Sequence, residues 1–153
     1  MLKYTGYTIA FQEVPNEISL VFNISGCTHH CKGCHSQYLW EDVGRDLSMD
    51  IADAIRQYAD VITCVCFMGG DQDQKELVRL ANMCGGYKTC LYSGFDSLDD
   101  LKDCVGAFDY VKIGRYDERF GGLDKPTTNQ RMYVMENGNV KEDITAKFRR
   151  KYI

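Results

Sequence analysis

Three cysteines stand close together near the start of the chain, and they are the residues best suited to chemistry. Cys27, Cys31 and Cys34 follow the spacing C-x3-C-x2-C, directly after the apolar run 18–24. Thiolates gathered this closely hold a metal ion or an iron-sulfur cluster, and three is one fewer than a closed site uses. If the bound group is a [4Fe-4S] cluster, one iron stays open to a small molecule. The spacing then indicates a catalytic site.

Two other kinds of site use part of this pattern. Cys31 and Cys34 form a C-x2-C pair, which also occurs as a redox dithiol at a helix start, but a redox dithiol has no use for Cys27. A structural zinc site would add a nearby histidine, although zinc ribbons usually bring a second Cys or His pair from elsewhere in the chain. A non-catalytic zinc-binding interaction module therefore stays open as an alternative. The three histidines of this stretch are His29, His30 and His35.

The composition is that of an ordinary globular protein. A chain of 153 residues with 44% hydrophobic and 26% charged residues fits one domain, 1–153. A net charge of −4 lacks the basic character of nucleic-acid binders. No apolar run approaches the roughly 20 residues of a membrane-spanning helix, and no signal-peptide pattern opens the chain. We therefore expect a cytoplasmic protein with no nucleic-acid or membrane partner, whose eight cysteines are thiols or metal ligands.

Alternating strands and helices are expected to position the cysteine loop. Apolar or alternating runs predict strands at residues 7–11, 18–24, 61–68, 87–92, 110–113, 131–136 and 139–142. Helical periodicity predicts helices from 48 to about 59, from 74 to 84 and from 97 to 104. This alternation favours an α/β fold with a parallel sheet and right-handed crossovers. Because a closed eight-stranded barrel takes about 250 residues, we expect a partial, open TIM-like βα barrel.

Several local patterns add detail to this outline. Ser48 is the expected N-cap of the first helix. The residues at helical spacing on its expected core face are Met49, Ala52, Ile55 and Ala59. The unpatterned stretch 115–130 suits an ordered loop over the mouth of the site. Asn137-Gly138 favours a C-terminal β-hairpin, because both residues tolerate the positive φ of a type I′ turn.

The five cysteines outside the motif are expected to belong to the core. Cys64 and Cys66 are two residues apart, so they share one face of their strand, where buried thiols behave as small hydrophobes. Cys84, Cys90 and Cys104 also occupy apolar positions of their elements. Trp40 is expected to pack the loop against the core, with a wall of the site as the alternative.

Together, these motifs resemble those of the radical S-adenosylmethionine (SAM) enzymes. The superfamily is marked by C-x3-C-x2-C after its first barrel strand and a Gly-Gly-acid turn after its second. Within it, the chain is most similar to the anaerobic ribonucleoside-triphosphate reductase-activating proteins. The residues that carry the resemblance are Gly26-Cys27-x-His29-x-Cys31-x-Gly33-Cys34 with Trp40, Gly69-Gly70-Asp71, Tyr92-Ser93-Gly94 and Thr128-Asn129-Gln130-Arg131.

The resemblance implies that Cys27, Cys31 and Cys34 hold a [4Fe-4S] cluster whose open iron is chelated by SAM. An electron from the cluster would then cleave SAM into methionine and a 5′-deoxyadenosyl radical. That radical would take a hydrogen atom from a glycine near the C-terminus of the large reductase subunit. The implied electron donor is a flavodoxin or a ferredoxin. An activase of another glycyl-radical enzyme, of the pyruvate formate-lyase type, is the nearest alternative.

The resemblance also implies a set of SAM-binding residues, with no catalytic residue beyond the cluster ligands. Gly69, Gly70 and Asp71 match the turn that binds the methionine amino group, which suits a close backbone and an acidic acceptor. The weaker expectations are polar contacts from Tyr92, Ser93 and Gly94 and backbone contacts to the adenine from Ile113 and Gly114. The open side of the partial barrel is expected to admit the partner's glycine loop, unless the C-terminal hairpin covers it.

Overall fold

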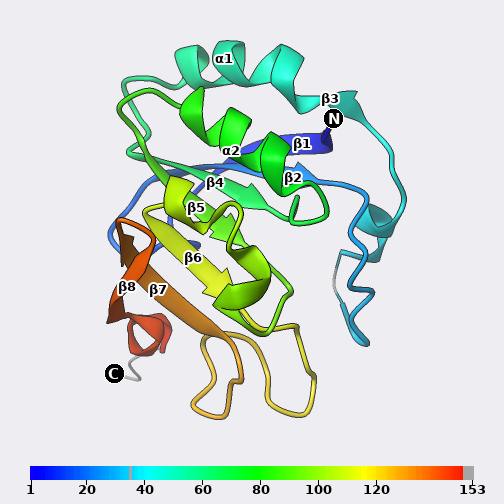
Figure 1. Ribbon diagram of the computed structural model, residues 1–153, viewed down its shortest axis with the longest axis vertical. Coiled ribbons are helices and arrows are strands. Elements are labelled where there is room, and N and C mark those ends of the chain that lie inside the picture. Colours follow the sequence, from blue (N-terminus) through cyan, green and yellow to red (C-terminus); the bar gives the residue numbers. More distant parts are fainter. Residues whose placement is uncertain (35, 150–153) are drawn as a thin grey trace.

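The structure is a computed structural model that describes residues 1–34 and 36–149. Within that part, one eight-stranded sheet runs in the order β3-β1-β2-β4-β5-β6-β7-β8 (Figure 1). The strands are β1 (Lys3–Ala10), β2 (Ser19–Ile24), β3 (Arg45–Asp46), β4 (Cys64–Met68), β5 (Lys88–Tyr92), β6 (Tyr110–Ile113), β7 (Arg131–Glu136) and β8 (Asn139–Asp143). The α-helices are α1 (Leu47–Gln57) and α2 (Gln74–Asn82). No helix in the described ranges is long and apolar enough to cross a membrane.

The middle of the sheet is parallel. Strands β2, β4, β5 and β6 run in one direction, so their C-terminal ends meet at one edge of the sheet. Antiparallel strands β1 and β3 extend one side, and the hairpin β7–β8 extends the other. The loops that follow the four parallel strands are therefore neighbours, as in other open α/β sheets.

The predicted partial, open TIM-like βα barrel is wrong. The sheet is mixed and not closed, and the described chain has two α-helices. The connection from β5 to β6 forms only the short 3-10 turns Leu98–Leu101 and Val105–Ala107 where a third helix was expected. Barrel closure requires the outermost strands to pair with each other. Here the outer strands of the parallel set pair with antiparallel strands, so the sheet grows sideways and stays open.

Helix α1 differs in register from the sequence prediction. Asp46 is the N-cap, and its side chain accepts hydrogen bonds from the backbone N–H of Ser48 at 3.0 Å and from its hydroxyl at 2.8 Å. Met49 is 74% exposed, and Ala52 and Ala59 are exposed too. The core-facing residues of α1 are Leu47, Ile51, Ala54 and Ile55. Of the predicted core face only Ile55 is buried, because the face that packs against the sheet is the one carrying Leu47, Ile51 and Ala54.

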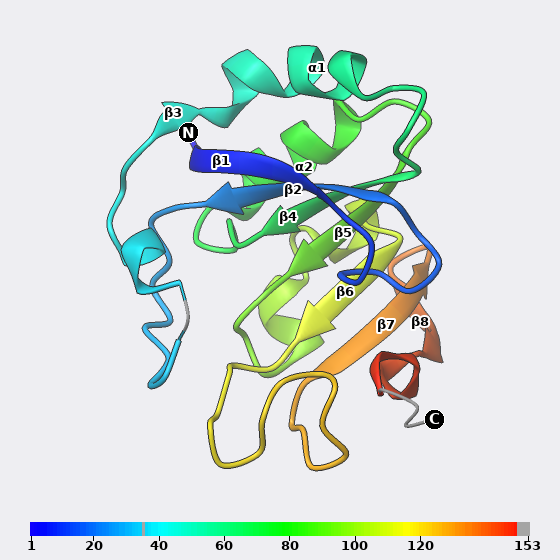
Figure 2. The same ribbon diagram turned by 180° about the vertical axis from the view of Figure 1, so that it is seen from behind.

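The sheet has a core on each face. Both α-helices cover one face, where Ile51 and Leu77 join Phe22, Phe67 and Leu91 in one apolar cluster (Figure 1). The opposite face carries a second cluster with Val21, Cys64, Cys66, Cys90, Tyr110 and Met132. The β1–β2 loop lies across this second face and buries Val14 there, as Figure 2 shows. Central strands covered on both faces read as continuous apolar runs, as β4 does.

The prediction that the other five cysteines are core residues is confirmed. Cys64, Cys66 and Cys90 are fully buried on the second face, while Cys84 and Cys104 are buried on the helix side. Burial raises the pKa of the Cys84 and Cys104 thiols to about 12, and it raises the pKa of Cys64 and Cys90 as well. Cys64, Cys84, Cys90 and Cys104 therefore fold as neutral thiols.

These buried thiols predict a fold that is weak in alkali. Between pH 9 and 12 the unfolded chain has ionised thiols while the folded chain keeps Cys84 and Cys104 protonated, so the free energy of unfolding falls as pH rises. A pKa raised from 9.0 to about 12 corresponds to about 4 kcal/mol per thiol, against a total stability of about 5–15 kcal/mol. Urea unfolding under reducing conditions at about pH 8 and about pH 10 measures this loss. Cys84→Ala should reduce the slope, and a stability independent of pH would contradict the prediction.

Candidate functional site

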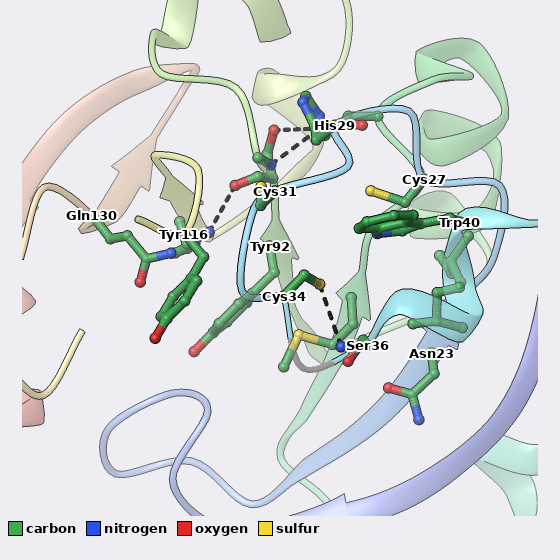
Figure 3. A pocket seen from close by; sticks show the side chains of 18 residues that line it. Asn23, Cys27, His29, Cys31, Cys34, Ser36, Trp40, Tyr92, Tyr116 and Gln130 are labelled. Carbon is green, nitrogen blue, oxygen red and sulfur yellow. Dashed lines mark hydrogen bonds and ion pairs between the residues drawn. The ribbon is translucent and has the colours of Figure 1, made fainter. Parts of the chain in front are cut away.

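A pocket opens at the C-terminal ends of the parallel strands, with a volume of about 270 Å³. Cys27, Cys31 and Cys34 all line it, as Figure 3 shows. The other residues that carry polar groups into the wall are Asn23, His29, Ser36, Trp40, Asp71, Tyr92, Ser93, Lys112, Tyr116 and Gln130. The topology therefore gathers the cysteine loop and the ends of β4, β5 and β6 around one cavity.

The three motif cysteines differ from the remaining five in exposure. Cys27, Cys31 and Cys34 are partly exposed, whereas the other five thiols are buried. Burial raises the pKa of Cys27, partly offset by backbone N–H groups of His29 and His30. The backbone N–H of Ser36 donates to the sulfur of Cys34 at 3.3 Å. The loop thus brings its three cysteines to the pocket and places backbone N–H donors at the sulfurs of Cys27 and Cys34.

A buried carboxylate ties the cysteine loop to the strand ends. Oδ2 of Asp71 accepts hydrogen bonds from the hydroxyl of Ser93 at 2.5 Å and the backbone N–H of Gly94 at 3.3 Å, and it lies 2.7 Å from Nε2 of His29. The His29 ring also packs edge-on against Phe95 with centroids 4.7 Å apart. Burial alone raises the pKa of Asp71, but the hydrogen bonds of His29 and Ser93 outweigh it and lower that pKa. The contact between His29 and Asp71 was not predicted from the sequence.

The two glycines of the Gly-Gly-acid turn have different surroundings. Gly69 lines the pocket with φ +105°, a conformation that favours glycine. Gly70 does not line the pocket. Its φ is +99°, and it faces the helix-side core, where a Cβ would lie 2.8 Å from Cδ2 of Leu77 and 3.1 Å from Cδ1 of Leu2. Gly70 therefore allows α2 to pack close to the end of β4.

Gly70→Ala should destabilise the protein by about 2–4 kcal/mol, because it combines a positive φ with overpacking. Urea unfolding followed by circular dichroism measures the change. Gly86→Ala is the matched control, because a Cβ at Gly86 would meet no atom within 4 Å and should change stability by less than about 0.5 kcal/mol. Equal effects from both substitutions would contradict this account of the turn.

The later strand ends contribute some of the expected residues and not others. Tyr92, Ser93 and Gly94 all line the pocket, and the hydroxyl of Tyr92 donates to the backbone carbonyl of Glu13 in the β1–β2 loop. Ile113 and Gly114 do not line the pocket. Ile113 packs in the helix-side core because it alternates with Lys112 along β6, and the Gly114 N–H donates to the Phe95 carbonyl at 2.6 Å.

Lys112 and Gln130 are among the pocket residues to which the sequence analysis assigns no contact, although Gln130 belongs to the Thr128 to Arg131 motif. Lys112 is buried, and its ammonium donates to the carbonyls of Ser93 at 2.9 Å and Gly114 at 2.8 Å. Burial lowers its pKa to about 8, against the opposing influence of Cys31 and other acidic groups. Gln130 donates to the same Gly114 carbonyl at 3.3 Å. Lys112 could have been suspected from the sequence, because it is the one charged residue in the otherwise apolar strand β6.

The remaining members of the cysteine loop also have definite places. The ring of His30 stacks on Trp40 with centroids 4.4 Å apart and an angle of 13°. Trp40 also lines the pocket, so it forms part of the site's wall as well as packing the loop. His35 lies outside the described residues.

Most of the chain that builds this site matches the profile of a known protein family. The profile of 4Fe-4S single cluster domains matches residues 17–119, about two thirds of the chain. The chain belongs to this family. The matched segment of the 4Fe-4S single cluster domain holds the three motif cysteines and strands β2 to β6. No curated protein and no solved structure matches the chain.

The residues of the pocket fit an iron-sulfur cluster. Within residues 1–34 and 36–149, no three His, Cys, Asp or Glu side chains converge on one point as ligands of a single ion do. A 4Fe-4S cluster does not need such convergence, because each thiolate binds a different iron. The buried Nε1–H of Trp40 also lacks a partner among the described residues, and cluster sulfur is a suitable acceptor. In the 4Fe-4S single cluster domain, Cys27, Cys31 and Cys34 are therefore the candidate ligands.

Proposed function

We propose that this 4Fe-4S single cluster domain is a radical SAM activase of the anaerobic ribonucleoside-triphosphate reductase. One observation carries the proposal: three partly exposed cysteines share a pocket with a buried carboxylate at the next parallel strand end. Three thiolates leave one iron of a cubane without a protein ligand. A pocket beside that iron, lined by an acid and by glycine backbone, suits a small ligand with an amino group.

The chain's own residues have separate roles in this proposal. Cys27, Cys31 and Cys34 hold the cluster, and His29 holds their loop against Asp71. Asp71 accepts a hydrogen bond from the amino group of SAM. Its three observed contacts all use Oδ2, and a carboxylate offers lone pairs on both oxygens.

The chemistry itself belongs to the cofactors. When bound and reduced, the cluster would supply the electron that splits SAM into methionine and a 5′-deoxyadenosyl radical, which would take a hydrogen atom from the reductase glycine and leave as 5′-deoxyadenosine. A flavodoxin- or ferredoxin-type donor supplies the electron. The protein orients SAM and excludes water and competing acceptors from the pocket.

The reductase assignment is supported by the Thr128 to Arg131 segment and by access to the pocket. Gln130 of this segment lines the pocket, and Asn129 donates to the carbonyl of Arg115 at 3.0 Å, which fixes the adjoining loop. The hairpin β7–β8 extends the far side of the sheet, and none of its described residues lines the pocket. A protein glycine loop can therefore approach the pocket without displacing the hairpin.

Electron paramagnetic resonance provides the test. The protein is purified and reconstituted anaerobically, then mixed with SAM, a reductant and the large subunit of an anaerobic reductase. The expected result is a glycyl-radical signal together with 5′-deoxyadenosine. Cleavage of SAM without that signal would reject the reductase as partner, and a glycyl signal only with a formate-lyase-type enzyme would replace it. A colourless protein with stoichiometric zinc would reject the radical chemistry.

A further inference from the structure

The pocket wall contains a buried positive charge that pairs with no carboxylate among the described residues. Lys112 is 7% exposed, and its ammonium donates to two neutral backbone carbonyls, at 2.9 and 2.8 Å. Lysine is rarely buried without an anionic partner, because removing the charge from water is costly. Burying the Lys112 ammonium lowers the stability of the fold, so its presence in the pocket wall is better explained by a ligand.

The two carbonyls fix the direction of the ammonium group. An ammonium has three donors, and the Ser93 and Gly114 carbonyls use two of them. The Tyr92 ring lies on another side, with its centroid 5.8 Å from Nζ. Lys112 itself lines the pocket, so the third donor is available to a group inside it. The lysine is thus held in place before any ligand arrives, and preorganised donors bind anions well.

The pocket contains a buried carboxylate, Asp71, as well as this cation. Asp71 follows β4 and Lys112 lies on β6, with β5 between them, and both line the same cavity. A ligand with one ammonium and one carboxylate, which is the free end of an amino acid, complements both residues. A carboxylate has lone pairs on two oxygens, so one oxygen can accept from Lys112 while the other stays available to a metal.

We propose that Lys112 forms a carboxylate-binding subsite that makes the pocket selective for a ligand with a free α-carboxylate. The inference rests on the proposed function, because SAM is such a ligand. It adds to that function a residue that selects SAM over adenosyl sulfonium compounds without the carboxylate. In this role Lys112 touches the ligand and not the reacting bond.

A structural role makes a different prediction. If Lys112 served only to hold the Ser93 and Gly114 carbonyls, a neutral side chain with N–H donors would replace it. Lys112→Gln offers such an amide, whereas Lys112→Met offers similar length with no donor. The two variants therefore separate the charge from the hydrogen bonds. Lys88→Gln is the control, since Lys88 is an exposed lysine near another tyrosine ring, 5.7 Å from the Tyr110 centroid.

The experiment measures binding of two ligands without turnover. Anaerobically reconstituted wild-type protein and the three variants are dialysed to equilibrium against SAM and against decarboxylated SAM, with no reductant present. Wild-type protein and Lys88→Gln should prefer SAM by at least about tenfold. Lys112→Met and Lys112→Gln should each bind SAM about ten- to a hundredfold more weakly, with affinity for decarboxylated SAM within about threefold of wild type.

Each contrary result has a distinct meaning. If wild-type protein binds SAM but Lys112→Gln keeps the full preference for SAM, the lysine is structural and the inference is wrong. If both variants lose affinity for the two ligands equally, Lys112 shapes the pocket and does not read the carboxylate, which also overturns the inference. If wild-type protein carries its cluster and binds no SAM, the proposed function fails and the subsite fails with it. Circular dichroism confirms that each variant is folded.

Discussion

Replacing Cys27, Cys31 or Cys34 by alanine should leave the protein unable to retain its 4Fe-4S cluster. Each substitution removes one of three candidate ligands from a site that has no spare cysteine nearby, because the other five thiols are buried in the two cores. After anaerobic reconstitution and desalting, iron should fall below about one atom per chain, and SAM cleavage should fall by at least about a hundredfold.

The matched control for the cluster ligands is Cys66→Ala. Cys66 is fully buried on the second face of the sheet and pairs in register with Cys90 on the neighbouring strand. Its replacement should cost about 1–2 kcal/mol of stability through lost packing, with iron content unchanged. Iron analysis and urea unfolding on the same samples separate the two effects. Loss of iron from Cys66→Ala with retention in Cys31→Ala would reverse the ligand assignment.

Asp71→Asn should weaken both SAM binding and the attachment of the cysteine loop. The carboxylate of Asp71 is 4% exposed and receives three contacts on one oxygen, from His29, Ser93 and Gly94. A neutral amide keeps the shape but loses the charge that strengthens those bonds and the proposed bond to the SAM ammonium. We expect about a ten- to hundredfold loss of SAM affinity and about 1–3 kcal/mol lower stability.

Asp73→Asn is the control for the loss of an acid in the same segment. Asp73 is the N-cap of α2, and its side chain accepts from the backbone N–H of Glu76 at 3.2 Å. Asparagine caps helices about as well as aspartate, so this variant should keep wild-type stability and SAM affinity. Equilibrium dialysis measures the SAM affinity of each variant, and urea unfolding measures its stability. An Asp71→Asn protein with the SAM affinity of Asp73→Asn would remove Asp71 from the proposed site.

Local sequence patterns correctly predicted several features that depend only on residues adjacent in the chain. Strand β6 has the predicted bounds 110–113, and the Asn137-Gly138 turn joins β7 to β8 with positive φ at both residues. The shared face of Cys64 and Cys66 also follows from two-residue alternation alone. Helix α1 shows the limit, because the side of the helix that packs against the sheet depends on distant residues, and only Ile55 of the predicted core face is buried.

Features that depend on distant residues were not predictable in the same way. The architecture of the sheet depends on which strands pair. Because β1 pairs antiparallel with β2 and β7 pairs antiparallel with β6, the sheet is mixed and does not form a βα barrel. Whether a strand-end residue faces the pocket depends on pleat and packing, which place Lys112 in the wall and Ile113 in the opposite core. His29 could be suspected as a loop histidine, but its partner Asp71 is 42 residues away.

The residues that hold the cysteine loop in place are widely spaced along the chain, so the loop gains its full support late in synthesis. The cysteine loop is synthesised early, yet its support at Asp71 follows 42 residues later, and Ser93 follows that by another 22. A nascent chain that ends before β5 contains all three thiols and the pair His29–Asp71, but it lacks the Ser93 and Gly94 groups that also donate to Asp71. Contacts so distant in sequence form only once the intervening chain has folded. The support of the cysteine loop is therefore complete only once β5 has joined the sheet.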